Sequence, residues 1–212
     1  MSTEAAAGPD PRRRPGRTGA TRRKLFAAAM DLIGERGPAQ VTVDEIAAAA
    51  GVAKGTVYYN FGSKSVLVGQ LFEYGVDMME ERLQAGTETG DPLQALEAMV
   101  ESAVDFLGEY PSFAQLWVSE MWRRPSDWHT TLTALRHRLL EDIRAAVQRL
   151  ADNYPVRGDL TVDGVAAALF GAAFVVSLDR TVYSQRSRAE SVAAIMTVIH
   201  GYLATGAGPR TL

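Results

Sequence analysis

Residues 42–67 contain two short helical patterns separated by a glycine turn, and this arrangement constrains the fold more than any other feature of the chain. Thr42 and Glu45 have the spacing of a capping box, which predicts that a helix begins just after Thr42. Gly51 can adopt the left-handed conformation that ends this helix, and a second short helix is predicted at about 53–60. Two short helices joined in this way indicate a helix-turn-helix, whose second helix fits the major groove of DNA.

Amphipathic helical patterns lie on both sides of this motif. Before it, Thr21 can cap a helix whose apolar residues recur at helical spacing until Gly34 and Gly37 end it. After it comes a longer helix that contains Gly69 and Gly75. Each glycine inside a helix costs up to about 1 kcal/mol relative to alanine, and close packing explains the pair better than a pliable joint does.

The remainder of the chain is also predicted to be helical. Five periodic segments follow the motif, and none alternates as a strand does; they cover approximately 93–108, 111–122, 127–153, 162–179 and 189–205. The predicted fold class is therefore all-α, with a three-helix DNA-binding domain at 20–66 and a helical domain at 67–206. Residues 1–19 are predicted to be a flexible basic arm and 207–212 a tail.

The charge of the chain is divided by position. The 212 residues carry a net charge of -3, which is unusual for a DNA-binding protein. Up to Gln70, however, ten Lys or Arg stand against six Asp or Glu, a net of +4, while the remainder has twelve against nineteen, a net of -7. The basic part includes Arg12, Arg13, Arg14 and Arg17. These are expected to contact phosphates; reaching into a minor groove and forming a merely solubilising tail are the alternatives.

Several classes of protein are disfavoured by what the sequence lacks. Without cysteine the chain has no disulfides or thiolate metal sites. The longest apolar stretch, 164–178, is shorter than the roughly 20 residues of a membrane span, and no secretory signal is evident, so a cytoplasmic protein is expected. No Walker, G-x-S-x-G or H-E-x-x-H motif occurs, and His129, His137 and His200 are scattered. We therefore expect no enzyme activity, metal or cofactor.

The side chains beyond the turn suit DNA recognition. Lys54 offers donors for guanine O6 and N7, and Gly55 permits close approach of the backbone. Thr56 can contact a thymine methyl or a phosphate, and a Tyr hydroxyl can hold a phosphate. Other roles are open: Tyr58 could support the core, Thr56 could stabilise the turn, and Lys64 could be a solvated charge.

These residues resemble the DNA-binding signature of the tetracycline-repressor (TetR) family. The resemblance rests on many positions of residues 42–67, namely Thr42, Val43, Ile46, Ala47, Ala50, Gly51, Val52, Lys54, Gly55, Thr56, Val57, Tyr58, Tyr59, Phe61, Lys64 and Leu67. It implies a three-helix DNA-binding domain followed by a helical domain for ligand binding and dimerisation. It also implies a homodimer that represses transcription at palindromic operators and is released by a small-molecule effector.

The resemblance also implies which residues contact DNA. By position, the recognition helix would meet bases or adjoining backbone with Lys54, Gly55, Thr56 and Tyr59. Phosphates would be held by Tyr58, Asn60 and Lys64, and by Thr42 at the start of the preceding helix. Two positions depart from the pattern. Ala53 replaces a common Ser or Thr, which removes a hydroxyl that caps the helix or touches phosphate, and Asn60 replaces the more usual His.

Later residues are candidates for a ligand pocket and a dimer interface. An apolar or aromatic ligand is expected to contact some of Phe106, Phe113, Trp117, Met121, Trp128, Phe170 and Phe174, although each alone also suits an ordinary core. Acidic residues at Glu97, Glu101, Asp105 and Glu120 could select a cation, but a solvated face is the default. The expected twofold interface comprises Ala168, Gly171, Ala172, Val175, Ala193, Met196 and His200.

One other hypothesis keeps the fold but changes the function. A helical ligand carrier or co-regulator that does not bind DNA would share the same helices, and the missing hydroxyl at Ala53 is the one hint in its favour.

Overall fold

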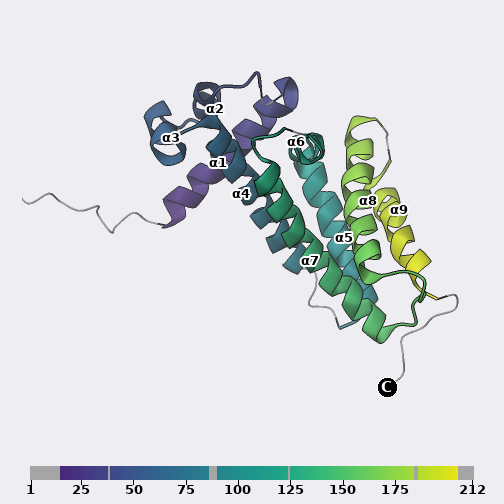
Figure 1. Cartoon of the computed structure of the whole chain (residues 1–212). Helices are drawn as coiled ribbons and strands as arrows, with labels where there is room; N and C mark the ends of the chain where they lie inside the picture. The colour runs from purple at the N-terminus through teal and green to yellow at the C-terminus, as the bar shows by residue number, and fades with distance from the viewer. Residues whose placement is uncertain (1–14, 38, 86–89, 124, 184–185, 205–212) are drawn as a thin grey trace, which may run out of the picture.

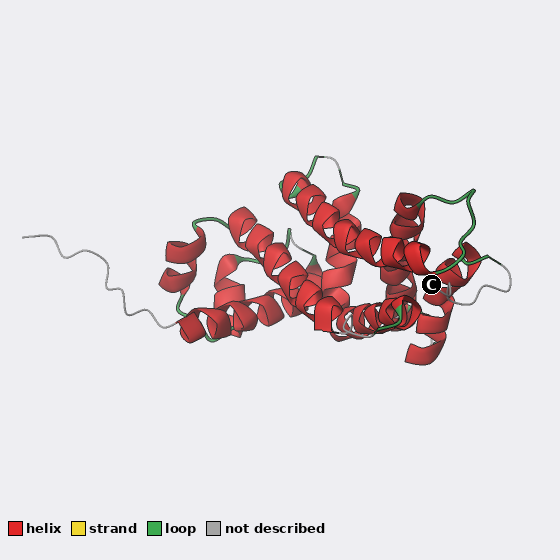
Figure 2. Cartoon of the chain, turned by 90° about the horizontal axis from the view of Figure 1, so that it is seen from below, coloured by secondary structure: helices red, strands yellow, loops and turns green. Residues whose placement is uncertain are grey.

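Helices make up the regular structure of the chain. The computed structural model describes residues 15–37, 39–85, 90–123, 125–183 and 186–204. Within these ranges the chain forms helices joined by loops, as Figure 2 shows, together with one isolated β-bridge between Val156 and Leu203. The predicted all-α class is therefore confirmed.

The helices form two groups that share one long helix. Their bounds are α1 (Pro15–Arg36), α2 (Val43–Ala49), α3 (Lys54–Phe61), α4 (Lys64–Ala85), α5 (Pro92–Glu109), α6 (Pro111–Met121), α7 (His129–Asn153), α8 (Val162–Val182) and α9 (Arg188–Tyr202). Figure 1 shows α1–α3 gathered at one end of the molecule and α5–α9 at the other, with α4 running from the first group into the second.

Helix α1 begins earlier than the sequence analysis predicted. Its first residue is Pro15, so 15–19, which we assigned to the flexible arm, are helical, and Thr21 lies inside the helix. Proline suits the first position of a helix because its missing N–H would have had no partner there. Residues 1–14, with Arg12, Arg13 and Arg14, and the predicted tail 207–212 lie outside the described residues.

Glycines end the first helices, with one exception. Gly37 has a φ of 76° after the last residue of α1, and Gly51 has a φ of 63° in the turn after α2. Gly34, by contrast, lies inside α1 and does not end it. A Cβ atom at Gly34 would lie 2.0 Å from Oγ of Ser112, so this glycine lets α1 approach α6 closely.

An aromatic cluster joins the two groups of helices. Phe26 of α1 and Phe72 of α4 lie against Phe113 of α6, with ring centroids 5.9 and 6.3 Å apart, and Trp117 lies 5.7 Å from Phe113. A Cβ atom at Gly75 would lie 2.5 Å from Cε2 of Phe113, which confirms that this glycine serves close packing. The cluster therefore fixes α4 against α1 and α6.

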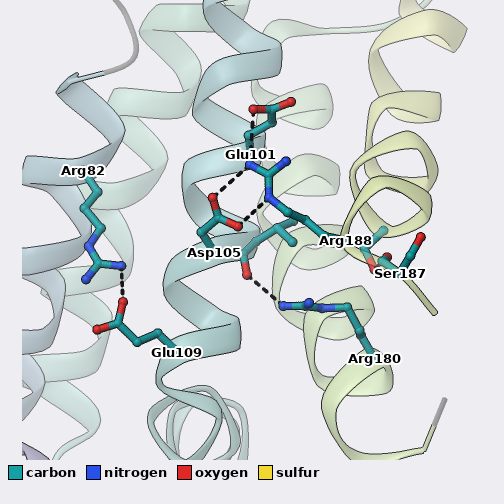
Figure 3. A network of polar contacts seen from close by, with 9 residues as sticks. Arg82, Glu101, Asp105, Glu109, Arg180, Ser187 and Arg188 are labelled. Atoms are coloured by element: carbon teal, nitrogen blue, oxygen red, sulfur yellow. Dashed lines mark hydrogen bonds and ion pairs between the residues drawn. The ribbon is translucent and has the colours of Figure 1, made fainter. Parts of the chain in front are cut away.

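Ion pairs connect α5 with its neighbours at the surface. Figure 3 shows Arg188 of α9 bound to two acids of α5, with its Nε 2.6 Å from Asp105 Oδ1 and its Nη2 3.2 Å from Glu101 Oε2. Arg82 of α4 lies 2.7 Å from Glu109. Glu101 and Asp105 thus face a guanidinium at a partly exposed position, where such pairs contribute about 0 to 1 kcal/mol.

The connection from α6 to α7 is bound to the start of α4. Glu120 is buried, contrary to the default of a solvated face, and accepts hydrogen bonds from Arg123 (2.8 Å) and Ser126 (3.1 Å). The indole N–H of Trp128 donates to the carbonyl of Ser65, 2.9 Å away. This loop therefore contacts the first turn of α4, directly after α3.

Replacing Gly75 by Ala should destabilise the protein by about 1 to 3 kcal/mol, because the Phe113 ring is fully buried and cannot move aside. The matched variant is Gly69→Ala in the same helix, where the nearest atom, Cδ1 of Trp128, would lie at an ordinary 3.7 Å. That variant should be neutral or more stable by up to about 1 kcal/mol. Urea unfolding of both variants tests the difference, and equal stabilities would contradict it.

Candidate nucleic-acid interface and cavity

A capping box fixes the start of α2, as the sequence predicted. The backbone N–H of Glu45 donates to Thr42 Oγ1 at 3.2 Å, and the N–H of Thr42 donates to Glu45 Oε2 at 2.8 Å. Arg36 of α1 donates to the other oxygen of the same carboxylate at 2.8 Å. The hydrogen bonds from Arg36 and then Thr42 lower the pKa of Glu45 to about 2, so the carboxylate is charged at neutral pH.

Helix α3 presents one face to the protein and another to solvent. Val57 is fully buried against the other helices, while Lys54, Gly55 and Tyr58 are exposed. The N-cap is Ala53, which offers no side-chain hydrogen bond to the first turn, as expected from its departure from the family pattern. The predicted contacts Thr56, Tyr59 and Asn60 also belong to α3, but their side chains lie outside the described residues.

Lys54 is held in place by two side chains. Its Nζ donates a short hydrogen bond to Oδ2 of Asp44 in α2, and it lies 5.7 Å from the centroid of the Tyr58 ring. The hydrogen bond to Asp44 raises the pKa of the Lys54 ammonium. The Lys54 side chain remains 62% exposed, so two of its three donors can still reach an external partner.

Asp44 was not among the site residues predicted from the sequence. A signal existed, because the capping box at Thr42 puts Asp44 in the first turn of α2. The short turn then brings the start of α3 close to it. An acid at this position of a helix-turn-helix is therefore a candidate partner for a basic residue that opens the second helix.

Neither the packing nor the backbone conformation of the protein requires glycine at Gly55. A Cβ atom at this position would meet no protein atom within 4 Å, and φ is not positive. The missing side chain therefore leaves open space on the outer face of α3, beside Lys54. Such space suits close approach of a molecule that is not part of this chain.

Thr42 and Lys64 already have partners near the same surface. The hydroxyl of Thr42 donates to Glu45 at 2.8 Å within the capping box. Lys64 donates to the carbonyl of Ala39 at 3.3 Å and so connects the start of α4 to the loop before α2. Both residues lie where the motif predicts, but a phosphate would have to share or displace these bonds.

A narrow apolar cavity lies among α4, α5, α7 and α8. The space between its walls, including the part open to solvent, is about 440 Å³. Its lining residues are Met79, Leu83, Leu96, Met99, Val100, Ala103, Leu139, Ile143, Leu169, Phe170, Ala173 and Phe174. All twelve are apolar, so a ligand would meet hydrophobic walls.

Only two of the predicted ligand residues line this cavity. Phe170 and Phe174 do, with ring centroids 5.0 Å apart. The other candidates lie elsewhere: Phe106, Phe113 and Trp117 are fully buried in the aromatic core, and Met121 and Trp128 pack partly buried against that core. Half of the twelve lining residues are leucine or methionine, and these were not among the aromatic candidates predicted from the sequence.

Helices α8 and α9 expose small and apolar residues. Ala168, Val175, Ala193 and His200 are exposed, and Gly171 and Ala172 are half-buried. Met196 is the exception among the residues predicted for a dimer interface. It is only 3% exposed and packs into the core of its own chain, because it lies on the inner face of α9 with Ile195 and Ile199.

Helix α8 is unusually apolar for its burial. It is the one helix within the described ranges that is long and apolar enough to cross a membrane, with a mean hydropathy of 1.7 in an 18-residue window. Only 39% of that window is buried inside the chain. A core helix can pass the same test of length and composition, so the significant observation is the exposed share of its surface.

The described residues contain no cluster of side chains suited to bind a metal ion. Among the described residues no group of three or more His, Asp or Glu side chains is placed to bind one.

The amino-acid sequence is similar to those of bacterial transcriptional regulators. Residues 25–71 match the model of the family described as bacterial regulatory proteins, tetR family. An uncharacterized HTH-type transcriptional regulator of Mycobacterium tuberculosis is 25% identical over 147 residues, 69% of each chain. The probable acrEF/envCD operon repressor of Escherichia coli is 28% identical over 94 residues, 43% of this chain and 42% of its own.

Solved structures share the fold. The structure of a putative TetR-family transcriptional regulator from Rhodococcus sp. superposes with a TM-score of 0.74 at 15% identity, over 88% of this chain and all of the other. FadR from Bacillus subtilis, solved in complex with stearoyl-CoA, gives a TM-score of 0.71 at 19% identity, over 84% of this chain and 98% of its own.

Gly55→Ala should separate folding from DNA binding. The new methyl group meets nothing in the protein, so stability should stay the same or rise by up to about 1 kcal/mol. Binding to double-stranded DNA should weaken by roughly 1 to 3 kcal/mol, the size of one lost base contact. Gly158→Ala, at a loop glycine with equally open surroundings, is the control. Fluorescence anisotropy with labelled DNA tests the prediction, and an unchanged affinity for Gly55→Ala would refute it.

Proposed function

We propose, on the premise that the chain belongs to the TetR family of transcriptional regulators, that it is a ligand-responsive repressor. In this proposal residues 20–66, with the helical residues that precede them, read DNA, and 67–206 bind an effector and dimerise. The protein acts as a homodimer on a palindromic operator in the cytoplasm, and a small apolar or aromatic effector releases it.

The outer face of α3 carries the proposal of DNA recognition. Lys54 holds two free donors there, and Gly55 leaves room for a base pair edge to come close. The Tyr58 side chain is 43% exposed beside them, which supports contact with an external partner over a role in the core. These three residues form one small surface that is accessible and offers hydrogen-bond donors.

The exposed face of α8 supports a homodimer. Ala168, Gly171 and Val175 follow one another at helical spacing, and Val175 is 60% exposed. Small residues allow a second helix to approach closely, and the neighbouring face of α9 adds Ala193. Two copies joined through this face would present two copies of α3, which in a helix-turn-helix dimer lie about one DNA turn, roughly 34 to 36 Å, or a multiple of it apart.

Helix α4 supports regulation by a ligand. It begins directly after α3 at Lys64, and its later residues Met79 and Leu83 line the apolar cavity. An effector that moves these two side chains therefore acts on α4, the helix that directly follows α3. Because binding free energies are linked, an effector that weakens operator binding must itself bind less tightly to the DNA-bound protein, by the same factor.

Lys54→Ala should weaken binding to the preferred operator by about 1 to 3 kcal/mol and relax the preference at one base position. The physical reason is the loss of ammonium donors to guanine acceptors. Selection of operators from a random DNA library, followed by anisotropy on the selected sequence, measures both effects. Arg149→Ala, which removes an exposed cation from α7, is the control for net charge.

The same selection tests the broader proposal. If Lys54→Ala keeps the base preference of the wild type, Lys54 does not contact a base directly. If the wild-type protein selects no sequence at all, a helical carrier or co-regulator that does not bind DNA becomes the better assignment.

Val175→Asp should convert the dimer to a monomer, because it places two charges against each other across a twofold interface. Operator affinity should then fall by about tenfold or more, since one recognition helix is lost from each complex. Leu160→Asp, a matched change at an apolar residue that is 38% exposed in the loop before α8, should leave the dimer intact. Analytical ultracentrifugation measures the oligomeric state of both variants. If Val175→Asp is still a dimer, the exposed face of α8 is not the dimer interface.

A further inference from the structure

We propose that the cavity takes an amphipathic anion, a molecule with an apolar chain and a carboxylate, and that Arg136 binds the carboxylate. The inference deepens the proposed function, since it names the chemical class of the effector. It depends on two observations: the composition of the cavity walls and the surroundings of one arginine.

The walls alone cannot hold a polar group. All twelve lining side chains are apolar, and none offers a hydrogen bond donor or acceptor. A hydroxyl, carboxylate or ammonium group enclosed by them would lose its hydration without a replacement, which is unfavourable for neutral groups and much more so for ions. Any polar end of a ligand must therefore lie where a polar protein group borders the cavity.

Arg136 is such a group. Its guanidinium carbon lies 5.7 Å from the centroid of the Phe170 ring, and Phe170 is a wall of the cavity. Leu139 and Ile143 follow Arg136 on the same face of α7, and both line the cavity as well. The arginine is half-buried, so the guanidinium lies beside the apolar wall and still reaches solvent.

Arg136 also has unused bonding capacity. Two other arginines of α7 face carboxylates: Arg138 pairs with Asp77 and Glu80, and Arg144 pairs with Asp163. None of the ion pairs among the described residues includes Arg136. Within the described residues its guanidinium lies over the face of the Phe170 ring. The guanidinium N–H donors are therefore available to an acid from outside the chain.

The two observations together select a ligand class. A guanidinium binds a carboxylate through two parallel N–H···O bonds, which are stronger than bonds to a neutral hydroxyl. The apolar chain of the ligand would lie along the leucine, methionine and phenylalanine walls. A neutral ligand of the same shape would gain only the apolar contacts, and a cation would be repelled by Arg136.

The test compares three molecules with the same chain: decanoate, decanol and decyltrimethylammonium. Their affinities for the full-length protein can be measured by isothermal titration calorimetry and by tryptophan fluorescence. Trp117 should report binding, since its indole stacks 5.8 Å from the ring of the cavity residue Phe174. Wild-type protein should bind decanoate about tenfold more tightly than decanol, and the cation least tightly.

Two variants test whether Arg136 causes the preference for decanoate over decanol. Arg136→Met keeps the length and apolar character of the stem, so it should bind decanol as the wild type does and lose the preference for decanoate. Arg149→Met, on an exposed face of the same helix, removes the same charge and should keep the preference. Equal affinities for decanoate and decanol in the wild type, a preference that survives Arg136→Met, or no binding of any of the three would each overturn the inference.

A separate measurement distinguishes this inference from the proposed function. Operator binding is followed with and without decanoate at saturation. Binding of decanoate through Arg136 without any effect on the operator complex would uphold the ligand class and contradict the effector role. Release of the operator by decanol and decanoate at equal concentrations would support the effector role and contradict the part assigned to Arg136.

Discussion

Contact between the Phe113 ring and the backbone of α4 at Gly75 fixes how the two groups of helices are joined. Phe26 of α1 meets the same ring, so helices from both groups share one buried aromatic cluster. Tightly packed interiors shift between discrete arrangements and do not deform smoothly. A displacement of α4 near the cavity is therefore expected to reach α3 as a change of tilt or position of the whole helix.

Local sequence patterns predicted most of the fold. The periodic segment 162–179 became α8 with the same first residue, and 127–153 became α7 with the same last residue. The capping box of Thr42 and Glu45 formed as its spacing required. These features depend on residues within a few positions of each other, which is why a single sequence is sufficient to find them.

The remaining features depend on which helices meet. Met79 and Phe170 face one cavity, although they belong to different helices far apart in the chain, and helical spacing alone does not show this. The same reason explains Met196, whose apolar side chain suits either an interface or a core. For the outer face of α3 the family resemblance supplied positions, and Lys54, Gly55 and Tyr58 are exposed there. Their contacts with DNA stay a prediction. Pairing of Asp44 with Lys54 needed the geometry of the turn.

In the proposed complex with DNA, that ion pair has a consequence for the choice among binding sites. A backbone phosphate that approaches Lys54 also approaches the carboxylate of Asp44, so attraction and repulsion nearly cancel. The guanine acceptors O6 and N7 carry partial charges only, and the Lys54 ammonium still has donors for them. If Lys54 contacts a base as proposed, the ion pair would weaken binding at non-specific DNA sites more than at the operator.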